Sequence, residues 1–155
     1  MSSPTATPVL SPQFVLLMAL ACGLCAGSAY FNQPLIYSIE KSLAISTSQA
    51  GFAVVVAQIG YGLGLMLLVP LGDLLNKRKL IVSLMVFAAI SQILLSLSSS
   101  LSVLYFFTLC ATFGAISAQV LIPFASTISP PESSAAIVGK LMSGLVMGIT
   151  LSRTF

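Results

Sequence analysis

Five long apolar stretches follow one another along this chain of 155 residues, and they constrain its fold more than any other feature. They cover about residues 14–34, 49–71, 80–97, 103–125 and 137–155. A helix needs about 20 residues to cross the roughly 30 Å hydrocarbon layer of a bilayer, and each stretch is close to that length. The apolar residues run continuously and do not alternate with a period of two, which favours helices over the strands of a membrane barrel. We therefore predict an all-α, polytopic membrane protein that forms a bundle of about five transmembrane helices.

The composition excludes several classes of protein. Charged residues make up 6% of the chain, whereas soluble domains have about a quarter. There is no histidine, and the three cysteines, Cys22, Cys25 and Cys110, all lie inside apolar stretches. The Cys22-x-x-Cys25 spacing occurs in metal and redox sites, but without histidine or a second cysteine pair two small residues in a membrane helix explain it better. We expect no enzyme activity, no metal, no cofactor and no nucleic-acid partner.

The segments outside the apolar stretches define the domain organisation that we expect. Residues 1–13 are short, uncharged and rich in Ser, Thr and Pro, and we interpret them as a disordered lead before a transmembrane domain of residues 14–155. Residues 36–48 are expected to form an outer loop, and residues 126–136 a cytoplasmic loop. Arg153 is expected to reach the outer surface from the end of the fifth span, and the alternative is that it faces an aqueous pathway.

The stretch from Val69 to Lys79 reads V-P-L-G-D-L-L-N-K-R-K and connects the second and third spans. Its charged residues are Asp73, Lys77, Arg78 and Lys79, which are four of the nine in the chain. Short loops with several basic residues remain on the cytoplasmic side of a membrane. This rule places the loop, and with it the N-terminus, in the cytoplasm.

This loop resembles the signature G-x-L-x-D-R-x-G-R-R between helices 2 and 3 of the major facilitator superfamily. Leu71, Asp73, Lys77 and Arg78 match the signature or keep its charge, whereas Val69, Leu74 and Asn76 depart from it. The resemblance implies that Asp73, with Lys77 and Arg78, belongs to a cytoplasmic gate that holds the two halves of a transporter together. The alternative is that the positive charge only orients the chain, although orientation does not require an acid within a basic loop.

The end of the first span, Tyr-Phe-Asn-Gln-Pro, resembles the first helix of bacterial drug-efflux members of the same superfamily. Tyr30, Asn32 and Gln33, together with Gln119 of the fourth span, are therefore candidates to line a substrate cavity. The alternatives are an interfacial position for the first three residues and a hydrogen bond to a neighbouring helix for Gln119. Cys110 occupies the place at which this family often has an arginine linked to proton coupling.

Glycines recur in three of the spans at a spacing that allows helices to approach closely. The candidates for helix packing are Gly23, Gly27, Gly60, Gly64, Gly144 and Gly148. There is also a weak internal repeat. Residues 26–34 share four identities with residues 115–123, and Gly60 falls opposite Gly148 when the comparison is shifted by one residue. In the superfamily, each half consists of two three-helix units of inverted topology, with helices 1 and 4 as equivalents.

Two kinds of function remain open from the sequence. The resemblance implies the N-terminal part of a small-molecule secondary transporter of the efflux type, in the drug-proton antiporter branch and in the bacterial inner membrane. Its partners would be the lipid bilayer, the substrate, and the missing C-terminal helices or another membrane subunit. The alternative is a complete small membrane protein, acting as an oligomeric transporter or a non-transporting subunit, or an inactive gene fragment.

Overall fold

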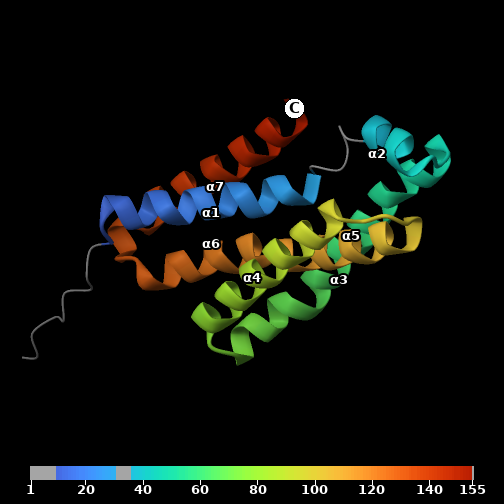
Figure 1. Ribbon diagram of the computed structural model, residues 1–155. Coiled ribbons are helices and arrows are strands. Elements are labelled where there is room, and N and C mark those ends of the chain that lie inside the picture. The colour runs from blue at the N-terminus through green and yellow to red at the C-terminus, as the bar shows by residue number, and fades with distance from the viewer. Residues whose placement is uncertain (1–9, 31–35, 155) are drawn as a thin grey trace, which may run out of the picture.

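The computed structural model describes residues 10–30 and 36–154, and within these residues it contains helices and no strand. The helices in chain order are α1 (Pro12–Tyr30), α2 (Ile36–Leu43), α3 (Thr47–Leu74), α4 (Lys77–Ser96), α5 (Leu101–Ala115), α6 (Ser117–Ile128) and α7 (Pro131–Thr154). Figure 1 shows the long helices lying alongside one another as an elongated bundle. The short helix α2 sits at one end of it.

Five helical segments are long and apolar enough to cross a membrane among the described residues. They are α1, α3, α4, the continuous stretch of α5 and α6, and α7. The prediction of an all-α membrane protein with about five spans is therefore confirmed. We call the end of the bundle at which α3 meets α4 and α6 meets α7 the basic end, because Lys77, Arg78 and Lys79 lie there.

Several helices begin where the sequence places a cap. Ser46 caps α3 and forms a capping box with Gln49, in which the Ser46 backbone N–H donates to Gln49 Oε1 over 3.0 Å. The side chain of Asn76 accepts a hydrogen bond of 3.3 Å from the Lys79 backbone N–H at the start of α4. As a result, α3 and α4 extend beyond the apolar stretches that were expected, and few residues separate them.

Two of the segments expected between the spans contain helix. Residues 36–43 of the expected outer loop form α2, and the expected cytoplasmic loop of residues 126–136 is mostly helical. In that loop α6 continues to Ile128, and α7 already begins at Pro131. Proline suits the first position of a helix because its missing N–H would be unpaired there, and Glu132 in the first turn stabilises the positive end of the helix dipole.

The fourth span is interrupted between α5 and α6 at Ile116. Within α6, Pro123 has no N–H to donate to the carbonyl of Gln119, four residues earlier in the chain. Ile116 is fully buried, as are Cys22 of α1 and Leu141 of α7. These side chains belong to the apolar core, to which α1, α3, α4, α6 and α7 all contribute, with α6 packing between α1 and α4.

Helices of the first predicted repeat unit pack against helices of the second unit. Helix α1 packs most extensively against α7, and α3 packs against α5. A side-chain carbon at Gly148 would overlap the backbone of Gly23, and one at Gly60 would overlap Thr112. The alignment of the weak repeat that pairs Ala115 with Ala26 also pairs Thr112 with Gly23. The two glycine contacts therefore involve equivalent positions of the repeat.

The outer face of the bundle is apolar. Large hydrophobic side chains are exposed on every long helix, including Leu24 of α1, Met66 of α3, Phe106 of α5 and Met147 of α7. Soluble proteins rarely expose continuous apolar surface on this scale. The exposed surface is therefore one that suits lipid or further apolar helices.

Candidate functional site

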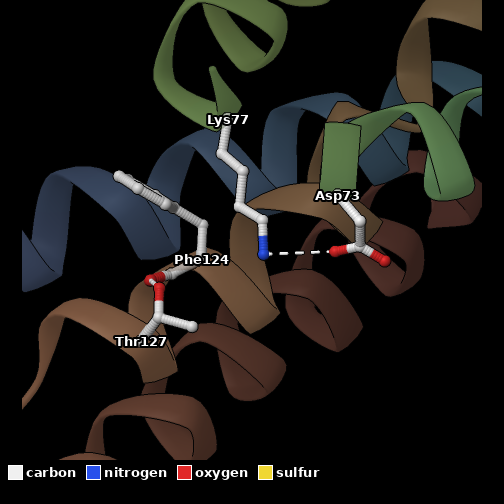
Figure 2. Close-up of polar contacts among 4 residues, drawn as sticks. All are labelled: Asp73, Lys77, Phe124 and Thr127. Carbon is white, nitrogen blue, oxygen red and sulfur yellow. Dashed lines mark hydrogen bonds and ion pairs between the residues drawn. The ribbon is translucent and has the colours of Figure 1, made fainter. Parts of the chain in front are cut away.

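The predicted gating residues gather at the corner between α3 and α4. Asp73 lies in the last turn of α3, Lys77 is the first residue of α4, and their side chains form an ion pair of 3.3 Å (Figure 2). The Asp73 side chain is 78% exposed and that of Lys77 is 30% exposed. Ion pairs with this exposure contribute at most about 1 kcal/mol to stability. The carboxylate of Asp73 is therefore accessible for contacts outside the described chain.

The helix dipoles do not favour these charges. Asp73 is an acid at the negative end of α3, and Lys77, Arg78 and Lys79 are bases at the positive end of α4. Membrane topology accounts for the bases. Neither topology nor the dipole accounts for the acid, which pairs locally with Lys77.

The corner is held against α6. A side-chain carbon at Gly72 would lie 3.2 Å from Val120, and Gly72 itself is buried. Figure 2 shows the ion pair in the same region as Phe124 and Thr127 of α6, where the Thr127 hydroxyl donates to the Phe124 carbonyl over 2.7 Å. Arg78 is exposed, and no ion pair is found for it within the described residues. The structure thus brings Asp73 and Lys77 together and leaves Arg78 apart.

Two of the candidate cavity residues, Gln119 and Tyr30, contact other helices of the bundle. The Gln119 side chain of α6 donates from Nε2 to the Tyr61 hydroxyl of α3 over 2.9 Å. Tyr30 ends α1 at the opposite end of the bundle, where the Arg153 guanidinium lies 5.2 Å from the centre of its ring. This distance suits a cation–π interaction. Asn32 and Gln33 lie outside the described residues.

Gln119 and Tyr30 occupy equivalent positions of the weak repeat, because the alignment that pairs Ala115 with Ala26 also pairs Gln119 with Tyr30. Each makes a polar contact with a helix of the other unit, Gln119 with α3 and Tyr30 with α7. The interhelical hydrogen bond that was the alternative for Gln119 is therefore present. It leaves Gln119 partly exposed and does not exclude contact with a ligand.

The six candidate packing glycines all lie at helix contacts. A side-chain carbon at Gly23 would come within 2.7 Å of the Gly144 carbonyl oxygen, and one at Gly27 within 3.0 Å of the Gly148 carbonyl oxygen. A side-chain carbon at Gly64 would come within 3.0 Å of the Phe113 carbonyl oxygen. Such small residues allow two helix backbones to approach each other closely.

A groove of about 1140 Å³ lies between α1 and α7, with Gln92 of α4 also in its lining. Its lining is mostly apolar or glycine but includes Lys140, which sequence reasoning missed. The signal in the sequence is one lysine inside the apolar stretch of residues 137–155. An ionisable residue within a span is a functional hypothesis by default.

The family model of the Major Facilitator Superfamily matches residues 17–155. The uncharacterized transporter YgaY of Escherichia coli, strains K12 and O157:H7, is 42% identical over 145 residues, which are 94% of this chain and 37% of YgaY. A protein of Streptomyces coelicolor named "Probable transporter SCO4007" is 29% identical over 140 residues, which are 90% of this chain and 33% of that protein. The chain thus spans little more than a third of the length of these relatives. No solved structure matches.

Proposed function

Because the chain belongs to the major facilitator superfamily, we propose that it forms the N-terminal part of a secondary transporter that exports small amphipathic molecules from bacteria. We propose further that the transporter belongs to the drug-proton antiporter branch and lies in the inner membrane. Its two bundles of helices would rock about a site at the middle of the membrane and expose that site to each side in turn. Its partners would be lipid, the substrate, and C-terminal helices that complete the carrier.

The observation that carries this proposal is the position of Asp73. The carboxylate is 78% exposed at the basic end, where the helix dipole of α3 disfavours it. A residue whose charge is disfavoured by its own helix is a candidate for a functional role. In a gate, the exposed carboxylate would pair with groups of the second bundle when the cytoplasmic side is closed.

Export of ethidium from cells that express the native gene product tests this role. We expect Asp73→Asn to lower the export rate several-fold while the amount of protein in the membrane fraction is unchanged. The matched control is Glu132→Gln, which removes an acid at the same end of the bundle whose position the α7 dipole already explains. Loss of Asp73→Asn protein from the membrane would instead assign Asp73 a structural role. Equal export by both variants and the parent would contradict the gate.

The second candidate is a complete small membrane protein, acting as an oligomeric transporter or a non-transporting subunit, or an inactive gene fragment. The chain spans 37% of YgaY and 33% of the Streptomyces coelicolor protein. An N-terminal tag at the native locus separates the two proposals on a gel of the membrane fraction. A product near 16.1 kDa supports the small protein, and a much larger one supports the carrier.

A further inference from the structure

A neutral polar pair lies near the middle of the second span, where Gln119 of α6 meets Tyr61 of α3. Tyr61 lies 14 residues after Thr47 and 13 residues before Leu74, so it is about 20 Å along the axis from either end of α3. The Gln119 side chain donates to the Tyr61 hydroxyl over 2.9 Å. At this depth in a bilayer, polar groups without hydrogen-bond partners are costly.

The pair retains unused hydrogen-bonding capacity. The Tyr61 oxygen accepts from Gln119, which leaves the hydroxyl proton of Tyr61 to donate elsewhere. Gln119 Oε1 accepts no hydrogen bond from the described residues. The main-chain carbonyl of Gln119 also lacks its usual helical partner, because Pro123 has no N–H. A donor and acceptors therefore remain at the same place.

The bundle leaves this place uncovered. Gln119 is the one residue of 114–122 that is not buried, and Pro123, one turn later, is exposed. On α3, Tyr61 is partly buried, and Gln58, one turn earlier, is exposed and makes no hydrogen bond with the described residues. A freed backbone carbonyl inside a membrane is tolerated where protein covers it or where it lines a water-filled cavity. Because the described chain does not cover Gln119, a cavity meets this condition.

We infer that Tyr61 and Gln119 bind the polar group of the transported molecule, and that this group is neutral and both accepts and donates hydrogen bonds, as a primary amide does. The amide oxygen would accept from the Tyr61 hydroxyl, and the amide N–H would donate to Gln119 Oε1 or to the Gln119 main-chain carbonyl. The inference rests on the proposed function. It adds Tyr61 as a binding residue and names a chemical class of substrate.

The lack of charge around the pair selects a neutral group. No charged side chain occurs on α3 before Asp73, or on α5 and α6. Asp73 lies 12 residues after Tyr61, about 18 Å along the axis of α3, which is too far to pair with an ion there. An ion would therefore lose its water without meeting a counter-charge on these helices. An amide instead exchanges its hydrogen bonds to water for hydrogen bonds to the pair.

Photolabelling of the native gene product in neutral detergent, with the labelled peptides identified by mass spectrometry, tests the site. Three probes share a benzophenone body. 4-Benzoylbenzamide carries the amide, 4-methylbenzophenone carries a methyl group instead, and (4-benzoylbenzyl)trimethylammonium carries a positive charge. We expect the amide probe to label α3 and α6 several-fold more than the other two, and excess benzamide to suppress this labelling. Equal labelling by the three probes would overturn the proposal, as would an absence of amide label from α3 and α6 because further helices cover the pair.

Variants then assign the selectivity to the two side chains. Tyr61→Phe and Gln119→Leu should each weaken binding of the amide probe about three- to tenfold, as for loss of one neutral hydrogen bond, and leave labelling by 4-methylbenzophenone unchanged. The matched control is Tyr105→Phe, which removes a hydroxyl that donates to the Gln49 carbonyl over 2.7 Å near the start of α3. It should not change amide binding. Unchanged amide binding by both Tyr61→Phe and Gln119→Leu would contradict the proposal. The preference of the parent protein needs no variant, so the test holds even if a variant misfolds.

The labelling assay measures binding and not export. A protein that still exports ethidium but shows no preference for the amide probe would overturn the binding site and leave the proposed function intact. Amide-selective labelling of a protein that exports nothing would contradict the proposed function and leave the binding site intact.

Discussion

The backbone of Gly23 in α1 lies where a side chain on Gly148 of α7 would have to be. The same contact continues one turn away, where a side-chain carbon at Gly27 would come within 3.0 Å of the Gly148 carbonyl oxygen. Helix α1 and helix α7 are far apart in the sequence, and this seam of glycines joins them. It also forms the floor of the groove that contains Lys140.

Gly148→Ala is expected to destabilise the bundle by about 1–3 kcal/mol, since the added methyl group meets backbone that cannot move aside easily. The matched control is Gly139→Ala on the same helix, where an added carbon would meet nothing within 4 Å. Unfolding in mixed micelles, followed by circular dichroism, gives the two free energies. Equal free energies for the two variants would show that α1 and α7 do not pack as described.

The equivalent contact of α3 with α5 makes a parallel prediction. Gly60→Ala should destabilise the protein to a similar extent, because its added carbon would meet Thr112 and would lie 3.1 Å from the Cα of Leu109. Gly62→Ala, two residues later, should be close to neutral because nothing lies within 4 Å. The same unfolding measurement compares them, and a reversed order would contradict the exchange of helices between the two units.

The hydrogen bond between Gln119 and Tyr61 should contribute modestly to stability. Tyr61→Phe removes the hydroxyl that accepts from Gln119 Nε2 over 2.9 Å, and interhelical hydrogen bonds in membranes average about 0.6 kcal/mol. A double-mutant cycle with Gln119→Leu isolates this coupling free energy. A coupling of zero would mean that the two side chains act independently, each free to meet a ligand.

The orientation of the chain predicts a labelling pattern. Cysteines introduced by Lys41→Cys and Ser99→Cys should react with an impermeant maleimide from outside the cell, and one introduced by Lys79→Cys only after the membrane is opened. All three positions are exposed, whereas the native Cys22, Cys25 and Cys110 lie inside helices. Replacing those three by alanine provides the background. The reverse pattern of labelling would place the basic end outside.

Much of the secondary structure follows from the sequence alone. Continuous apolar stretches of about 20 residues have to be helices in a membrane, since only then are all the backbone polar groups bonded internally. Local chemistry marks several helix starts, such as Asn76 before α4 and Pro131 before α7. Residues 126–136, expected between two spans, are mostly helical, because hydropathy marks where a helix enters lipid and not where the helix begins.

The polar contacts between helices could not be predicted in the same way. The sequence by itself determined the helical class, the number of spans, the clustered charge at one end and the glycines available for packing. Only the tertiary structure decided that Gly148 meets Gly23, that Gln119 meets Tyr61, and that Lys140 faces a groove beside α1. Hydropathy and caps act within one helix. Which faces of two helices meet depends on shape and packing over residues distant in the chain, because lipid is as apolar as the helix surfaces and does not favour one pairing over another.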